Sequence, residues 1–282
     1  MVNPFRDSQG TFRPGARAAL FLLLVVWLRQ PVPGLIWSIL GIPSLPFEWV
    51  DGAFVLALSA VFLRLEGRTL PSLGLSLDRR WALQFGLGAG LGMGLIGMAA
   101  LVAWTTGACR FQWVPAGALG RMISGAWLYL AVAINEELNF RGYGLQRAVE
   151  GFGLWPGQGL LALWFAYAHW NNPGMHGATL VWATLNIFLA GLFFGLVWMR
   201  TKSLAGPMGL HLGWNWMQGN VLGFGVSGGE SQGLLKPIFL DRPEWLSGGA
   251  FGLEAGLPCT VLCLFLIALT LRWKPKEQPY DA

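Results

Sequence analysis

Two adjacent glutamates, Glu136 and Glu137, end an apolar run that carries no charge from Met122 to Asn135. An unpaired charge at the centre of a spanning helix costs about 2.5–3.5 kcal/mol on insertion scales, so these carboxylates require a reason. Arg141 follows Glu137 by four residues, which puts both on one helix face and predicts an ion pair. Glu136 lies about 100° round the helix from Glu137. It lacks that partner, and a carboxylate held away from water can serve as a general base.

Two of the three histidines fall within apolar segments. His169 follows Phe165 by four residues, and Asn215 follows His211 by four residues, so each pair shares a helix face. Ionisable groups inside a membrane are candidates for function, because burying them is costly. We expect the segments that carry these groups to direct them into one shared polar cavity.

This set of side chains suits the hydrolysis of a peptide bond by an activated water. A glutamate and a histidine can orient and deprotonate the water, while a second histidine and an asparagine amide can donate hydrogen bonds to the developing oxyanion. An alternative is a zinc site in which Glu136, His169 and His211 are the protein ligands and water is the fourth. Neither scheme uses a covalent nucleophile.

The order of the motifs carries a resemblance to a known family. The patterns Glu136-Glu137-x-x-x-Arg141, Phe165-x-x-x-His169 and His211-x-x-x-Asn215 lie on separate apolar segments. In this order they resemble the three motifs of the CPBP intramembrane proteases, a family that includes the CAAX prenyl proteases and the bacterial Abi proteins. The similarity covers roughly residues 120–225.

The resemblance implies a role for each motif residue. Glu136 would activate water together with His169, and His211 and Asn215 would form the oxyanion site. Glu137, Arg141 and Phe165 would support them. A metal-free glutamate mechanism is favoured over zinc as a cofactor. The implied partner is a membrane-anchored or prenylated peptide or protein, within membrane lipid.

The composition indicates an integral membrane protein. Of the 282 residues, 54% are hydrophobic and 12% are charged, whereas soluble domains have about 25% charged residues. We expect an all-α bundle of about eight transmembrane helices that forms a single domain over residues 1–282, with a motif-bearing core at about 119–225. The net charge of +5 fits loops that face anionic lipid rather than a nucleic-acid partner.

The eight expected segments span about 17–42, 50–64, 81–106, 119–148, 155–170, 178–199, 203–225 and 255–271. The first is interrupted by Arg29, Pro31 and Pro33, so a kink is expected there. If the N-terminus is cytoplasmic, most Lys and Arg residues fall in cytoplasmic loops, as the positive-inside rule requires. Both termini are therefore predicted in the cytoplasm.

Residues 81–106 are rich in glycine and carry no charge. Small residues at such spacing let helices approach closely within lipid, so we expect tight packing there rather than a glycine loop that binds phosphate. Two other functions stay open for the chain as a whole. One is a proton-coupled membrane transporter that uses the same buried charges, and the other is a non-catalytic membrane scaffold or immunity protein.

Overall fold

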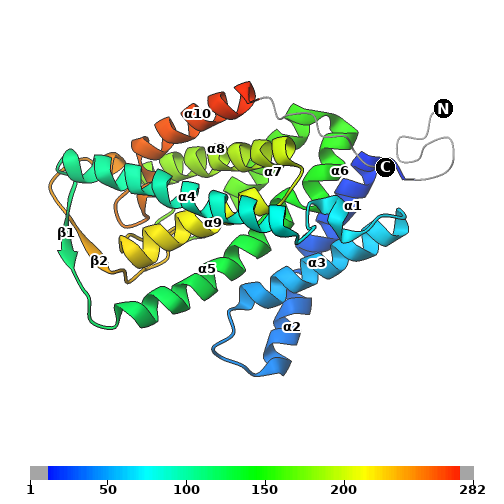
Figure 1. Cartoon of the computed structure of the whole chain (residues 1–282), viewed down its shortest axis with the longest axis horizontal. Coiled ribbons are helices and arrows are strands. Elements are labelled where there is room, and N and C mark those ends of the chain that lie inside the picture. Colours follow the sequence, from blue (N-terminus) through cyan, green and yellow to red (C-terminus); the bar gives the residue numbers. More distant parts are fainter. Residues whose placement is uncertain (1–11, 274–282) are drawn as a thin grey trace.

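The computed structural model describes residues 12–273, and most of them are helical (Figure 1). The helices are α1 (Pro14–Leu28), α2 (Pro31–Leu40), α3 (Phe47–Leu65), α4 (Arg79–Thr105), α5 (Ala118–Arg141), α6 (Tyr143–Phe152), α7 (Leu154–Ala168), α8 (Gly177–Thr201), α9 (Ala205–Trp216) and α10 (Leu257–Arg272). A π-helical turn, η2 (Met217–Val221), continues α9, and 3₁₀ turns lie at Leu70–Leu73 (η1), Glu244–Leu246 (η3) and Leu253–Ala255 (η4). Each apolar segment predicted from the sequence is therefore largely helical.

The predicted count of eight membrane spans is not confirmed. By length and composition, α4, α8 and the combined stretch Ala118–Phe152 can cross a membrane, and α1 with α2 forms a fourth candidate that is bent by 45°. The bend falls at the predicted interruption. Helices α7, α9 and α10 have only 15, 12 and 16 residues, and α3 carries Glu48, Asp51 and Arg64.

A small β-ribbon corrects the expectation of an all-α fold. Strands β1 (Cys109–Trp113) and β2 (Leu235–Phe239) pair antiparallel, with Cys109 opposite Phe239. The ribbon lies at one end of the helical bundle (Figure 1). It joins the loop after α4 to the loop after α9, which are more than 100 residues apart in the sequence.

Glycines bring α4 and α9 into contact through their backbones. A Cβ atom added at Gly92 would lie 2.2 Å from the carbonyl oxygen of Leu210, and one added at Gly213 would lie 2.0 Å from that of Ala89. Gly88 and Gly209 are equally restricted, at 2.5 and 2.1 Å from facing carbonyl oxygens. The expected close packing of the glycine-rich segment is confirmed, and it fixes the position of α9, which carries His211 and Asn215.

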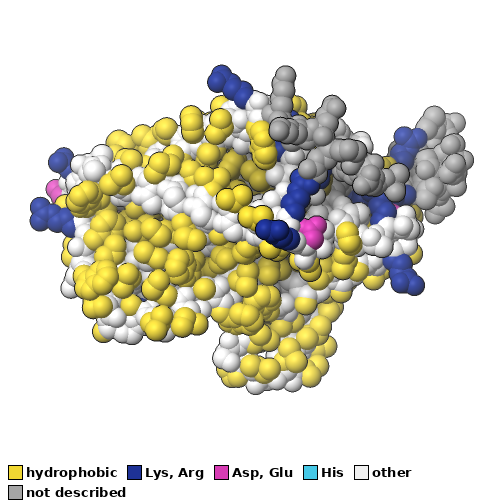
Figure 2. Space-filling model, viewed as in Figure 1, with side chains coloured by type: hydrophobic (Ala, Val, Ile, Leu, Met, Phe, Trp, Pro, Cys, Tyr) yellow, Lys and Arg dark blue, Asp and Glu magenta, His cyan; other side chains and the backbone are white. Residues whose placement is uncertain are grey.

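Large apolar side chains are exposed along the helices, among them Leu87, Leu91 and Leu101 on α4. Figure 2 shows a hydrophobic surface over the middle of one face, with charged side chains near the ends of the helices. An extensive apolar surface of this kind fits an environment of lipid. Both termini, which the sequence predicts to be cytoplasmic, lie outside the described residues.

Candidate active site

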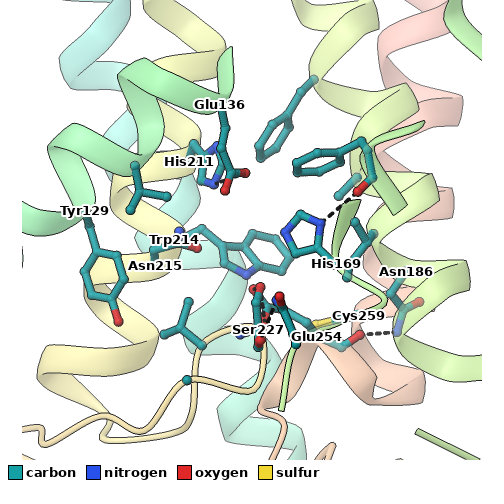
Figure 3. A pocket seen from close by; sticks show the side chains of 18 of the residues that line it. Tyr129, Glu136, His169, Asn186, His211, Trp214, Asn215, Ser227, Glu254 and Cys259 are labelled. Carbon is teal, nitrogen blue, oxygen red and sulfur yellow. Dashed lines mark hydrogen bonds and ion pairs between the residues drawn. The ribbon is translucent and has the colours of Figure 1, made fainter. Parts of the chain in front are cut away.

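A cavity of about 340 Å³ lies between α5, α7, α8 and α9 and the turn before α10 (Figure 3). The polar side chains in its wall are Glu48, Tyr129, Glu136, His169, Asn172, Asn186, His211, Asn215, Ser227 and Glu254. The four residues predicted to be catalytic, Glu136, His169, His211 and Asn215, all line this one cavity. The predicted convergence of three separate segments on a shared polar space is therefore confirmed.

Glu137 and Arg141 form the ion pair that their spacing predicts. Nη1 of Arg141 donates to Oε1 of Glu137 over 3.1 Å. Arg141 is 2% exposed and Glu137 is 0% exposed. Nη2 of Arg141 donates to the carbonyl oxygen of Gly191 on α8, and the guanidinium lies 4.5 Å from the ring centre of Phe165. The pair thus ties the end of α5 to α7 and α8, and Phe165 covers the cation.

His211 lies between the two glutamates. Its Nδ1 is 2.8 Å from Oε1 of Glu137, and its Nε2 is 3.6 Å from Oε2 of Glu136. Because a carboxylate accepts, Nδ1 carries a hydrogen and donates it to Glu137. The other ring nitrogen then points to Glu136, whose Oε2 is buried and has no hydrogen-bond partner among the described residues. Glu136 therefore retains an oxygen that can accept a proton.

His169 is the C-cap residue directly after α7, and it lies on another wall of the cavity (Figure 3). Its Nδ1 is 2.7 Å from the carbonyl oxygen of Phe165. A carbonyl only accepts, so Nδ1 carries the hydrogen, and in the neutral ring Nε2 keeps a lone pair for a cavity ligand. Within the described part of the chain, no ion pair joins His169 to Glu136. The resemblance pairs these two residues in activating water, whereas the nearer ring to Glu136 is that of His211.

Asn215 lies one helical turn beyond His211 on α9 and is buried in the same wall. The helix changes to the π-helical turn η2 two residues later. Such turns are frequent at functional sites, because they shift the side chains that follow them. The glycine contacts with α4 hold this part of α9 in place.

The zinc alternative uses Glu136, His169 and His211 as ligands. Among residues 12–273, no group of three or more His, Cys, Asp or Glu side chains is gathered closely enough to hold a metal ion. Nδ1 of each histidine is hydrogen-bonded, to Phe165 in one case and to Glu137 in the other, which leaves Nε2 of each ring as the possible metal ligand. As placed, these side chains do not fit a zinc site with three protein ligands.

The sequence analysis did not predict the buried charge of Asp51 on α3. Asp51 is 0% exposed and accepts hydrogen bonds from Nε of Arg29 at 2.6 Å and from the Asn135 amide at 3.0 Å. Asn139 donates to Asn135 in turn. This network holds the residue before Glu136. The aspartate within an apolar segment could have predicted this network, because a charge inside a membrane needs a buried partner.

Two further cavity residues come from loops. Oε2 of Glu254 accepts the backbone N–H of Ser227 over 2.6 Å, and both side chains line the cavity (Figure 3). Ser227 has a left-handed backbone, with φ of 49°. Nothing in the local sequence signals this contact, because 27 residues of irregular loop separate the two positions.

A comparison with known proteins finds one family that matches the segment carrying the three motifs. Residues 118–217 match the model of the family described as Type II CAAX prenyl endopeptidase Rce1-like. No curated protein and no solved structure matched the chain. The matched segment runs from the start of α5 to just beyond Asn215, so it contains all three motifs. Over residues 118–217, the chain is therefore similar to the Rce1-like family of type II CAAX prenyl endopeptidases.

Proposed function

We propose that the protein is an intramembrane endopeptidase that cleaves membrane-anchored or lipid-modified substrates with a water activated by Glu136. The observation that carries this proposal is the position of Glu136. It lines a polar cavity, its Oε2 has no hydrogen-bond partner in the described chain, and the ring of His211 is 3.6 Å away. The family of residues 118–217 implies a protease of the CAAX type.

The first chemical step joins a water to the scissile carbonyl. Glu136 takes one proton from the water, and the water oxygen forms a bond to the carbonyl carbon. The carbonyl oxygen becomes an oxyanion, which the Asn215 amide can stabilise by donating a hydrogen bond. Where the His211 ring carries both of its protons before the attack, its Nε2–H adds a second donor from the same wall. Glu137 contributes by holding the other nitrogen of that ring.

The second step breaks the carbon–nitrogen bond. The tetrahedral intermediate collapses, the leaving nitrogen takes a proton, and a carboxylic acid and an amine result. Glu136 can return the proton that it received, and His169 presents Nε2 to the cavity as a second site for proton transfer. In this scheme, His169 acts by exchanging a proton with the substrate.

The lining favours certain peptides. Its carboxylates are Glu48, Glu136 and Glu254, and no Lys or Arg lies among the described lining residues. Because like charges repel, an acidic group near the scissile bond is disfavoured. We propose a neutral or basic peptide segment that enters beside apolar wall residues such as Phe165, Phe194 and Trp214.

We also propose that the eight predicted segments lie in the membrane, with both ends in the cytoplasm. Contacts between loops support this topology. The β1–β2 ribbon joins two loops that are predicted on the outer side. Asn172 donates to the Ser227 carbonyl over 2.8 Å between two others on that side. On the inner side, the Leu204 N–H donates to the Gly74 carbonyl over 3.1 Å.

The test is cleavage of a quenched membrane-peptide library, with prenylated and unprenylated members, by purified protein in detergent. Wild type is compared with Glu136→Ala, with and without a chelator, and Glu230→Ala serves as the control because Glu230 is exposed and outside the cavity lining. Cleavage that is lost in Glu136→Ala but kept in the control and with chelator supports the proposal. Comparable cleavage by Glu136→Ala contradicts it.

Two other outcomes have distinct meanings. Activity that is lost with chelator and restored by zinc favours the metal-dependent alternative. Proton-coupled uptake by reconstituted wild type, abolished in Glu136→Ala without any cleavage, favours the transporter.

A further inference from the structure

A groove of about 850 Å³ runs between α4, α8, α9 and α10, apart from the cavity that holds Glu136. Helix α10 lies beside α8 (Figure 1) and contacts both α8 and α4. The buried side chains of Leu210 and Leu266 lie at the floor of the groove, and the exposed side chains of Leu87 and Leu269 form its edges. Within the described chain, the groove and the cavity share no lining residue.

Two glycines at the contact of α4 with α9 keep this space empty of side chains. Gly88 of α4 and Gly206 of α9 both line the groove. A Cβ atom added at Gly88 would lie 2.5 Å from the carbonyl oxygen of Gly206, so the backbones touch there. The two helices approach closely and leave a hollow above their contact, which another molecule can fill.

The groove follows one face of α4, from a basic residue to apolar ones. Arg80, Gln84, Leu87 and Leu91 line it at spacings of three or four residues, which places them on one side of the helix. At 1.5 Å per residue, the distance from Arg80 to Leu91 is about 16 Å. This is about half of the ~30 Å hydrocarbon core. The groove therefore has the depth of one leaflet of a bilayer.

Helices α8 and α10 show the same change from apolar to basic along the groove. On α8, Phe193 and Val197 are followed by Arg200 in the last turn. On α10, Leu269 is followed by Arg272, the last residue of the helix. Helix α4 begins at the end of the bundle at which α8 and α10 finish (Figure 1). The arginines of the three helices therefore lie at the same end of the groove.

This end of the groove is cationic and partly fixed in place. Its three arginines face no carboxylate, because no Asp or Glu is among the described lining residues. Nε and Nη2 of Arg200 donate to the carbonyl oxygens of Thr270 and Leu271, at 3.1 and 2.8 Å, which ties α8 to the end of α10. Trp273 also lines the groove, directly after Arg272. Tryptophan is enriched at the level of the lipid headgroups.

We infer that this groove binds an anionic phospholipid, with the headgroup at the arginines and an acyl chain along α4 and α10. Guanidinium groups suit phosphate oxygens, and basic pockets between transmembrane helices bind anionic headgroups. The bound chain would pack over the contact of Gly88 with Gly206 and so stabilise α9, which carries His211. The groove would bind this lipid whether or not the protein cleaves peptides.

Thermal unfolding of the full-length protein in detergent tests this site without requiring activity. The probes are phosphatidylglycerol, phosphatidylcholine with the same acyl chains, and inorganic phosphate. We expect phosphatidylglycerol to raise the melting temperature at a lower concentration than phosphatidylcholine, and inorganic phosphate to have no effect. Equal responses to the two lipids would assign the groove to acyl chains in general and overturn the inference. A response to inorganic phosphate as large as that to phosphatidylglycerol would also overturn it.

Two pairs of substitutions locate the headgroup. Arg80→Gln is compared with Arg79→Gln, because both residues are exposed at the start of α4 and only Arg80 lines the groove. Arg272→Gln is compared with Arg64→Gln, because each residue is exposed in the last turn of its helix and only Arg272 lines the groove. Each groove variant should require about tenfold more phosphatidylglycerol for the same shift, as expected for the loss of one charge-assisted hydrogen bond. Equal responses within both pairs would overturn the inference.

A third pair locates the acyl chain. Leu269 and Leu264 are 54% and 52% exposed on α10, and only Leu269 lines the groove. Leu269→Trp should fill the groove and abolish the preference for phosphatidylglycerol, whereas Leu264→Trp should keep it. The melting temperature of each variant without lipid shows whether it is folded. A preference that survives equally in both folded variants would contradict binding of the chain in this groove.

Discussion

Glu137 and His211 are joined by a hydrogen bond of 2.8 Å between carboxylate Oε1 and ring Nδ1, across 74 residues of sequence. The same Oε1 accepts from Arg141 at 3.1 Å. Glu137 therefore connects a buried cation to the ring that faces Glu136. The two neighbouring glutamates have different environments, because Glu137 is fully buried and Glu136 lines the cavity.

This difference between Glu136 and Glu137 predicts different effects when each is replaced by glutamine. Glu136→Gln removes the proposed base and should lower kcat by roughly 10²–10⁴-fold, the usual contribution of a positioned acid–base group. It should leave the melting temperature in detergent unchanged. Glu137→Gln should lower both kcat and the melting temperature, because it loosens His211 and breaks the pair with Arg141. Full activity in Glu137→Gln would show that the ring needs no such support.

Arg141→Ala should destabilise the protein strongly. Removing one partner of a buried ion pair leaves an uncompensated charge and costs about 3–5 kcal/mol. The loss of contact with Phe165 and Gly191 adds to this. Thermal unfolding in detergent measures the effect, with Arg110→Ala as the control because Arg110 is exposed on β1. Equal melting temperatures for the two variants would contradict the structural role of Arg141.

Gly92→Ala and Gly90→Ala form a matched pair on α4. An added Cβ at Gly92 would meet the Leu210 carbonyl oxygen at 2.2 Å, whereas at Gly90 it would meet nothing within 4 Å. Gly92→Ala should push α9 away from α4, displace His211 from Glu136, and lower both activity and melting temperature. Gly90→Ala should behave as wild type. The prediction is wrong if the two variants are indistinguishable in cleavage and unfolding assays.

We expect Glu254 to make the stability of the protein depend on pH. Burial raises the pKa of its carboxyl group, although the Ser227 N–H opposes this shift. A carboxyl group with a raised pKa in the folded state stabilises folding at low pH, and that contribution is lost as the pH rises through the folded-state value. We expect the melting temperature of wild type to decline as the pH rises above about 4, the ordinary range of glutamate.

The matched variant is Glu254→Gln, which keeps an oxygen to accept from Ser227 but does not ionise. Its melting temperature should change less over the same pH range. Glu244→Gln serves as the control, because Glu244 is exposed in the same long loop. An identical pH dependence in wild type and Glu254→Gln would exclude Glu254 as the source.

The sequence by itself determined the local features of this protein. Hydrophobic runs predicted the helical segments, and a spacing of four residues predicted the Glu137–Arg141 pair and the shared face of His211 and Asn215. These features follow from the 3.6-residue period of the helix, which links neighbours along one segment. The three motifs in order also predicted the family whose model matches residues 118–217.

Only the tertiary structure decided which residues meet across segments. It put His211 rather than His169 beside Glu136, buried Asp51 against Arg29 and Asn135, and brought Glu254 to Ser227. Such contacts depend on how closely helices approach, which here follows from the backbone contact between α4 and α9 at Gly92 and Gly213. They also depend on irregular loops, whose paths carry no periodic signal in the sequence.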